Sequence, residues 1–233
     1  MAMIDRMLIA TAVAAVVSAS SPANGQTILS TSGGGTPISP FGKPNAQTFG
    51  QTFTAPSDNV FQSLTFYLGP AGSLVFKAYV YSWDANTTRA TGSALFTSNP
   101  IIGPVGPPGS FIPVTVFFNS LVLDPGGTYV AFFSSSGQGT IGEVALQDAW
   151  DSPAANQYAG GAFVYLNNGE NTGAFTTQQW STDRQGPGSD VRFTMSFTST
   201  PEPASWAFML TGLASVGGLG LMRRRKRTPA LLE

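Results

Sequence analysis

The sequence predicts an all-β fold, an antiparallel and jelly-roll-like β-sandwich that fills residues 47–199. Three observations predict it. Glycine, proline and β-branched or aromatic residues dominate this region, and no part of it keeps helical periodicity for three turns. Short strand-like runs recur about eight times between turn residues, a spacing that is typical of two packed antiparallel sheets.

The expected strands follow one another along this region and are separated by turns. They are Gln47–Thr54, Val60–Leu68, Leu74–Trp83, Ala94–Thr97, Phe111–Asn119, Thr128–Ser134, Ala162–Leu166 and Val191–Thr198. Proline, glycine, aspartate and asparagine at residues 55–59, 68–72 and 124–127 supply the turn chemistry between them. Residues 102–110 hold three prolines and three glycines, so we expect a loop there that joins no sheet.

The expected strand at residues 74–83 indicates which of its faces is buried. Because successive side chains of a strand point to opposite faces, its residues divide into two sets. The apolar set, which we expect in the core, is Leu74, Phe76, Ala78 and Val80. The set on the opposite face is Val75, Lys77, Tyr79, Tyr81 and Trp83.

The segment before the next long strand predicts a tyrosine corner. Leu123 and Asp124 lead into a Pro-Gly-Gly turn, and Tyr129 follows the turn by two residues. This order resembles the corner of sandwich domains in which a tyrosine hydroxyl hydrogen-bonds to the backbone a few residues upstream. We therefore expect the Tyr129 hydroxyl to fix this turn.

The charges of residues 26–200 exclude one class of partner. The five cations are Lys43, Lys77, Arg89, Arg184 and Arg192. The nine acids are Asp58, Asp84, Asp124, Glu143, Asp148, Asp151, Glu170, Asp183 and Asp190. Five minus nine leaves a net charge of −4 on this region, and no basic patch is available to neutralise phosphates. We expect no nucleic-acid partner.

The chain has no cysteine and no histidine, which removes several kinds of chemistry. Without cysteine there is no disulfide, so the core alone must hold the fold. Zinc sites of the usual kind, Cys–His nucleophiles and Ser-His-Asp triads are excluded as well. A glycosidase would still need two carboxylates at a fixed separation, and no spacing among the nine acids singles out such a pair. We expect the protein not to be an enzyme.

The N-terminus predicts export. Met7–Val17 is an apolar run that is too short to span a membrane, and the small polar residues 18–26 follow it. This layout is typical of a secretory signal peptide over residues 1–25, with cleavage expected before Gln26 and Val17-Ser18-Ala19 as a second candidate site. Gly33-Gly34-Gly35 then predicts a flexible segment over residues 26–46.

The C-terminus predicts a membrane anchor. Pro201, Glu202 and Pro203 precede the uncharged stretch Ala204–Met222. As a helix that stretch would reach about 28 Å, close to the thickness of the hydrocarbon core of a bilayer. A stop-transfer cluster of cations follows, made of Arg223, Arg224, Arg225, Lys226 and Arg227. Because cations stay on the cytoplasmic side, we expect residues 228–233 to be a cytoplasmic tail and the body to lie outside.

The two ends together resemble one family of proteins. Residues 200–227, with Pro201, Glu202 and Pro203 as the motif, resemble the PEP-CTERM sorting signal of Gram-negative bacteria that make extracellular polysaccharide. The resemblance implies recognition by an exosortase, an inner-membrane protease that cuts near the motif. It also implies an inner-membrane precursor with a periplasmic body, which is later released to the cell surface or the extracellular matrix. Residues 51–56, 76–84 and 123–129 loosely resemble a sandwich domain that recurs in such proteins and has no established activity.

Carbohydrate binding is one candidate function of the sandwich. Sugar rings stack their C–H faces on exposed aromatic rings, while polar side chains bind the hydroxyls. The candidate residues are Tyr79, Tyr81, Trp83, Trp150 and Trp180. The alternative is that these rings are ordinary packing, since one face of every strand in a sandwich is buried.

Calcium is the second candidate, although we expect no cofactor. Asp148, Asp151 and residues 167–171 bring together the hard oxygens that calcium prefers. Neither group has the spacing of an EF-hand loop, and solvated polar loops explain both equally well. The sequence as a whole therefore predicts a non-catalytic, exported surface or matrix protein, with a carbohydrate-binding module as the alternative.

Overall fold

The computed structural model describes residues 25–32, 37–70, 72–139, 142–147, 157–182 and 189–199, with the backbone alone for 142–147. The expected signal peptide, the Pro-Glu-Pro motif, the membrane helix and the basic cluster lie outside these residues. Within the described part of the chain, no helix has the length and apolar character needed to cross a membrane.

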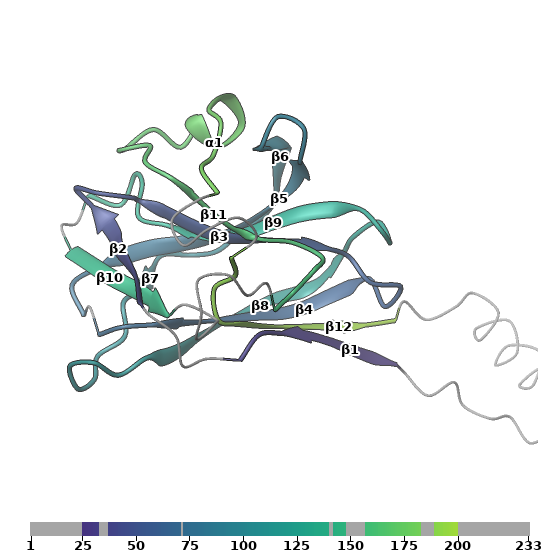
Figure 1. Ribbon diagram of the computed structural model, residues 1–233, viewed down its shortest axis with the longest axis horizontal. Helices are drawn as coiled ribbons and strands as arrows, with labels where there is room; N and C mark the ends of the chain where they lie inside the picture. The colour runs from purple at the N-terminus through teal and green to yellow at the C-terminus, as the bar shows by residue number, and fades with distance from the viewer. Residues whose placement is uncertain are drawn as a thin grey trace, which may run out of the picture.

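The described residues form two antiparallel sheets that lie as two layers (Figure 1). The first sheet contains β1 (Gln26–Ser30), β2 (Pro37–Lys43), β4 (Val60–Leu68), β8 (Ile112–Val122), β10 (Gly142–Gln147) and β12 (Phe193–Thr198). The second contains β3 (Thr48–Thr54), β5 (Val75–Asp84), β6 (Arg89–Thr97), β7 (Ile101–Ile102), β9 (Thr128–Ser134) and β11 (Phe163–Leu166). One helical turn, α1 (Ala174–Thr177), lies outside the second sheet (Figure 1). The all-β prediction is confirmed.

Along the sequence, the chain passes repeatedly from one sheet to the other. In the first sheet β12 lies between β1 and β4, and β8 pairs with the opposite edge of β4. In the second sheet the order is β11, β3, β9, β5 and β6. The chain crosses from one layer to the other at each of the steps β3 to β4, β4 to β5 and β8 to β9.

The core between the layers is built from phenylalanine. The largest fully buried side chains of the described residues are Phe41, Phe49, Phe53, Phe61, Phe66, Phe76, Phe132, Phe133, Phe163, Phe175, Phe193 and Phe197. Most of them belong to one cluster between the sheets, which also holds the inward set predicted for residues 74–83, namely Leu74, Phe76, Ala78 and Val80. The alternation predicted for β5 is therefore confirmed, and aromatic burial stabilises this fold without any disulfide.

Residues 26–46 differ from the flexible segment that the sequence predicts. β1 pairs along its whole length with β12, from Gln26 opposite Thr198 to Ser30 opposite Thr194, and β2 pairs with β10. Local sequence missed both strands because their partners lie far along the chain. β2 also contains two prolines, which normally argue against a strand but are tolerated at the edge of a sheet. The triglycine itself lies outside the described residues.

The loop predicted at residues 102–110 needs a smaller correction. Ile101 and Ile102 form β7, which pairs with Phe76 and Val75 at the start of β5. Ile102 therefore joins a sheet, although the proline-rich residues behind it do not.

The predicted tyrosine corner is confirmed. The backbone N–H of Asp124 donates a hydrogen bond of 2.8 Å to the Tyr129 hydroxyl oxygen, and the Tyr129 ring is only 5% exposed. The bond closes the turn that carries the chain from β8 in the first sheet to β9 in the second.

We expect Tyr129→Phe to lower the free energy of unfolding by about 1 kcal/mol, because the change removes one hydrogen bond and keeps the ring. Chemical denaturation monitored by tryptophan fluorescence measures this. Tyr67→Phe is a matched control, since Tyr67 lies half-buried under Arg192 on the outer face of β4, far from this turn in the sheet. Equal stability of Tyr129→Phe and the wild type would show that the corner does not stabilise the fold.

Candidate functional site

The outer face of the second sheet carries a layer of aromatic rings. Tyr79, Tyr81 and Trp83 point outward from β5, as the alternation predicts, and Phe132 points outward from the neighbouring strand β9. The Phe132 ring stacks on Tyr79 with 5.1 Å between ring centroids and on Tyr81 with 5.7 Å. Three of the five residues proposed for sugar binding therefore do lie together on one face.

A strap of the chain, residues 167–182, crosses this aromatic layer after β11 and carries α1 (Figure 1). Phe175 of α1 contacts Phe132 edge to face, with 4.9 Å between centroids. Trp180, near the end of the strap, contacts Phe132 at 5.0 Å and Trp83 at 5.7 Å, again edge to face. The strap thus adds a second, smaller apolar cluster on the outside of the sandwich.

The strap changes what the predicted sugar-binding rings can do. Tyr79 is 8% exposed and Trp180 is 2% exposed, so neither offers an open ring face. Tyr81 and Trp83 are half-buried, and Trp150 lies outside the described residues. Burial raises the pKa of the Tyr79 and Tyr81 hydroxyls above the ordinary tyrosine value. The rings therefore do not form the flat open platform that a stripe of aromatics on one strand suggests.

The C-terminal end of the strap is fixed to two elements of the sandwich. The backbone N–H of Trp180 donates to the carbonyl of Thr88, in the turn between β5 and β6, at 2.8 Å. The indole N–H of Trp180 donates to the carbonyl of Phe175 at 2.9 Å. Ser181 exchanges two backbone hydrogen bonds of 2.9 Å with Tyr165 of β11. The end of the strap is therefore held between the hairpin and the edge strand.

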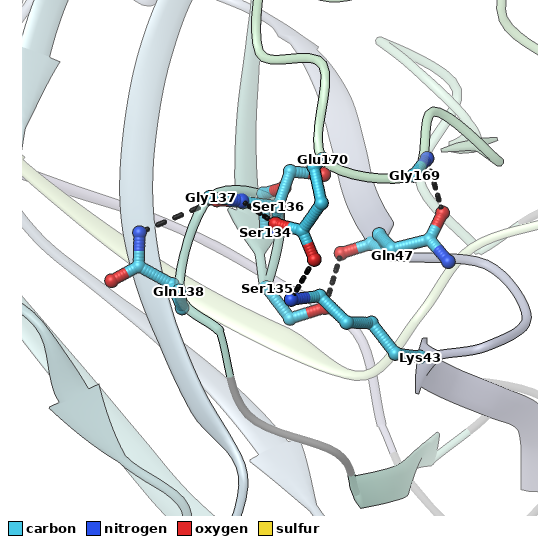
Figure 2. Close-up of polar contacts among 9 residues, drawn as sticks. All are labelled: Lys43, Gln47, Ser134, Ser135, Ser136, Gly137, Gln138, Gly169 and Glu170. Carbon is cyan, nitrogen blue, oxygen red and sulfur yellow. Dashed lines mark hydrogen bonds and ion pairs between the residues drawn. The ribbon is translucent and has the colours of Figure 1, made fainter.

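The N-terminal end of the strap is fixed by polar contacts, which Figure 2 shows. Glu170 forms an ion pair with Lys43 and accepts a hydrogen bond of 2.7 Å from the backbone N–H of Gly137. These contacts hold the pKa of the Glu170 carboxyl below its usual range, with Lys43 the larger cause. The side-chain oxygen of Gln47 accepts a bond of 2.8 Å from the N–H of Gly169.

Buried hydroxyl and amide groups continue this attachment into the second sheet. Thr48 of β3 and Ser134 of β9 share a hydrogen bond of 2.7 Å between their side-chain oxygens. Thr48 also donates to the Asn168 side-chain oxygen at 2.9 Å, and the Asn168 amide donates to the carbonyl of Asn171 at 2.8 Å. All three side chains that join here are buried.

Residues 167–171, one of the two groups proposed to bind calcium, include the residues that attach the strap. The oxygens of Asn168 and Glu170 already accept hydrogen bonds from the protein, and Glu170 also faces a cation. The described residues hold no group of three acidic side chains that could surround a metal ion. Asp148 and Asp151 lie outside the described residues. Calcium binding stays a prediction, and at residues 167–171 the ion would have to displace existing partners.

An open pocket of about 380 Å³ lies where the end of the strap meets the hairpin and β11. Its lining residues are Thr88, Tyr165, Gln179, Trp180, Ser181 and Thr182. They combine two aromatic rings with hydroxyl and amide groups, and none of them carries a charge. Hydroxyl and amide groups such as these can contact a polar neutral molecule.

Thr88 in this lining has an unusual conformation. Its φ is 45°, in the left-handed region that β-branched residues avoid. Its side-chain oxygen is buried without a hydrogen-bond partner. The hairpin turn that presents Thr88 is fixed by Asp84, whose carboxylate accepts bonds from the Asn86 N–H at 2.9 Å and the Thr87 hydroxyl at 2.6 Å. The Thr87 bond is the main reason that the pKa of Asp84 lies below its usual value.

A buried carboxylate lies elsewhere, under the chain that leads into β12. Asp190 is fully buried and is the only charged residue that is buried among those the structure describes. It accepts hydrogen bonds from the Gln51 amide at 2.7 Å, the Tyr158 N–H at 2.8 Å and the Gln157 N–H at 3.1 Å. Burial raises the pKa of the Asp190 carboxyl above its ordinary value, while the three bonds act in the opposite direction.

The arrangement around Asp190 is that of a structural anchor. Gln51 of β3 is fully buried too, and its amide oxygen accepts a bond of 3.2 Å from the Val191 N–H. The pair of side chains thereby ties the approach to β12 in the first sheet to β3 in the second. Both Asp190 oxygens are already engaged by donors of the protein.

Sequence reasoning missed the residues that shape the pocket. The turn chemistry of residues 84–88 contains an Asp and an Asn that indicate a tight turn, but nothing marks Thr88 as left-handed. Gln179 and Ser181 look like ordinary polar loop residues. The sequence singles out Trp180 because a large ring among polar residues is unusual. In the structure, this ring packs against the aromatic layer on the outer face of the second sheet.

Comparison with known solved structures gives only distant likeness. No protein-family model matches the chain, and no curated protein matches it significantly. One similar solved structure contains the cysteine protease and lectin-like domains of a surface layer associated protein of Clostridium difficile. The two are 9% identical over 66% of this chain and 32% of that chain, with a TM-score of 0.40. This chain spans about a third of that protein, and at this level the likeness carries no argument about function.

Proposed function

We propose that this chain is an exported, non-catalytic protein of the cell surface or extracellular matrix, sorted by an exosortase-type protease. One observation carries the proposal. β12 ends at Thr198, and the residues that resemble the sorting motif begin at Pro201. A cut near Pro201-Glu202-Pro203 would therefore release the two sheets whole. The uncharged stretch 204–222 and the cations 223–227 would remain with the membrane.

We also propose that the sandwich is a jelly roll held between a signal peptide and a membrane helix. The order β1, β12, β4, β8 in one sheet faces β3, β9, β5, β6 in the other. Two interleaved Greek keys give this order. Of the remaining strands, β11 extends the second sheet beside β3, β7 pairs with the start of β5, and β10 pairs with the end of β4 and with β2.

Replacing Pro201, Glu202 and Pro203 together by alanine tests the sorting. We expect the variant to stay in the inner-membrane fraction, while the wild type is released to the cell surface or the medium. Fractionation of cells followed by immunoblotting measures the distribution. Pro229→Ala, beyond the basic cluster, is the control and should be released like the wild type. Equal release of the triple variant would contradict the proposal.

A second candidate function is carbohydrate binding to extracellular polysaccharide, and the pocket beside Trp180 favours it. Among the described residues, the Tyr165 ring and several hydroxyl and amide groups line this pocket. Binding sites for small polar ligands combine these groups, with the rings covering apolar surface and the polar groups fixing orientation. The two functions are compatible, since a matrix protein that binds polysaccharide stays in the matrix.

A further inference from the structure

We propose that Asn86, in the turn between β5 and β6, is an acceptor site for an N-linked glycan. Asn86, Thr87 and Thr88 form the acceptor motif of N-glycosylation, Asn-x-Thr with no proline in the middle. Asn86 is the only asparagine of the chain that has a serine or threonine two positions later. The inference goes beyond the proposed function but rests on the export that it includes, because this motif is modified in secreted proteins.

The turn has the exposure that an acceptor site needs. Asn86 is exposed and lies in the short connection between Asp84, the last residue of β5, and Arg89, the first residue of β6. The loop end of this hairpin projects from the second sheet next to α1 (Figure 1). N-linked glycans are bulky and occur on surface loops, so an exposed turn of this kind can carry one.

The fold explains two of the side chains in this turn. The Asp84 carboxylate accepts a hydrogen bond of 2.9 Å from the Asn86 N–H and one of 2.6 Å from the Thr87 hydroxyl. Such local bonds from an aspartate to the residues that follow it stabilise tight turns. Asp84 and Thr87 therefore have a structural role that uses their side chains.

The fold does not explain Thr88. Its φ of 45° lies in the region that is unfavourable for a β-branched residue and easy for glycine. Its side-chain oxygen is buried, with no hydrogen-bond partner in the described part of the chain, which adds a further cost. The turn uses the Thr88 carbonyl, which accepts the Trp180 N–H at 2.8 Å and which every residue has. Threonine is costly here for the fold, whereas the acceptor motif requires a hydroxyl at this position.

The burial of the Thr88 hydroxyl also indicates when the glycan is attached. A transferase that recognises this hydroxyl cannot reach it in the closed hairpin. Transfer must therefore come before the hairpin closes, while the exported chain is still unfolded. Asn86 remains exposed after folding, so the attached glycan stays in water.

The transfer requires a lipid-linked oligosaccharide as donor and an oligosaccharyltransferase. The bond between C1 of the first sugar and the pyrophosphate oxygen of the donor breaks, and the lipid pyrophosphate leaves. A bond forms between this C1 and Nδ2 of Asn86, and the amide loses one proton to a base of the transferase. Nothing is oxidised or reduced. This chain supplies only the acceptor amide, which agrees with a non-catalytic protein.

Export of the full chain in bacterial cells that contain an oligosaccharyltransferase and a lipid-linked oligosaccharide of known mass tests the site. The intact mass reports both the glycan and the loss of the signal peptide, which marks export. We expect the wild type to gain the mass of one glycan and Asn86→Gln to gain none. Asn99→Gln is the matched control, since Asn99 is also exposed but lies outside any acceptor motif, and it should be modified like the wild type.

Two variants of Thr88 separate the motif from the fold. Thr88→Ser keeps the hydroxyl and should keep the glycan. Thr88→Gly should lose the glycan. Its melting temperature, compared with that of the unmodified wild type, should not fall, because glycine adopts this φ without strain and leaves no buried hydroxyl without a partner.

Four results would overturn the inference. An exported wild type without added mass would refute the acceptor site and leave export and sorting intact. A glycan retained in Asn86→Gln or Thr88→Gly would show that it is attached elsewhere. A lower melting temperature of Thr88→Gly would show that the fold itself requires threonine. A wild type that keeps its signal peptide and gains no glycan would refute both export and the acceptor site.

Discussion

Asp190→Ala is expected to lower the free energy of unfolding by about 3–5 kcal/mol, because it leaves several buried donors without an acceptor. The Gln51 amide and the Tyr158 and Gln157 N–H groups all point at this carboxylate. Urea denaturation of the full chain measures the loss. Asp124→Ala is the matched control, since Asp124 is exposed, and it should change the free energy by less than about 0.5 kcal/mol.

Asp190→Asn removes the titration of this residue, although its amide nitrogen must face donors whose hydrogen bonds the carboxylate accepts. The raised pKa means that the folded protein holds the Asp190 proton more tightly than the unfolded chain does. The contribution of Asp190 to the free energy of unfolding is therefore largest below the ordinary aspartate pKa of about 3.9. It decreases as the pH rises through the raised pKa of the folded state. The asparagine variant lacks this component. The lowered pKa values of Asp84 and Glu170 act in the opposite direction in both proteins.

The comparison of wild type and Asp190→Asn therefore has a definite sign. The free energy of unfolding of the wild type minus that of Asp190→Asn should decrease as the pH rises from about 4. At higher pH this difference should become constant. Thermal unfolding of both proteins at a series of pH values measures it. A constant difference across the whole range would show that the pKa of Asp190 is not raised. A shift in favour of the wild type would show that the three hydrogen bonds outweigh burial.

Trp180→Ala is expected to lower the free energy of unfolding by about 3–5 kcal/mol, the usual cost of truncating a buried tryptophan. The ring is 2% exposed and contacts Phe132 and Trp83, and its indole N–H holds the turn at Phe175. Without it the strap loses its apolar anchor, and Phe132 and Tyr79 become accessible to water.

Two measurements identify this loss as a release of the strap. Hydrogen exchange should quicken at the Trp180–Ser181 backbone bonds and in α1, and a dye that binds apolar surface should bind more strongly. Trp83→Ala is the comparison, because Trp83 is half-buried and contacts Trp180 edge to face. A smaller loss in Trp180→Ala than in Trp83→Ala would show that the strap is held mainly by its polar contacts at Glu170 and Asn168.

The sequence predicted those parts of the fold whose signal is local. Val60–Leu68 and Thr128–Ser134 match β4 and β9 in full, because each is a run of strand-forming residues between strong turns. The alternation of β5 separated its core face from its outer face. Tyr129 was found because its turn and its spacing together specify one hydrogen bond.

The parts that were missed depend on distant partners. β1 is a strand because it pairs with β12, and the residues Gln26–Ser30 by themselves do not indicate that pairing. The outward rings of β5 were correctly grouped, but whether they face water depended on a strap more than 80 residues later in the chain. The pocket follows from the same strap. Its residues come from the hairpin, β11 and the strap itself, which only the folded chain brings together.

The pairing of β1 with β12 has a mechanical consequence. Gln26 lies opposite Thr198, so a force that pulls residues 26 and 198 apart would break the ladder of β1 and β12 one bond after another, like a zipper. A pull on Thr198 alone, against a load held elsewhere on the sandwich, runs along β12, which is bonded to β1 on one side and β4 on the other. All of those bonds then share the load. A protein tethered through its C-terminal end would resist detachment much better than it resists being opened from both ends.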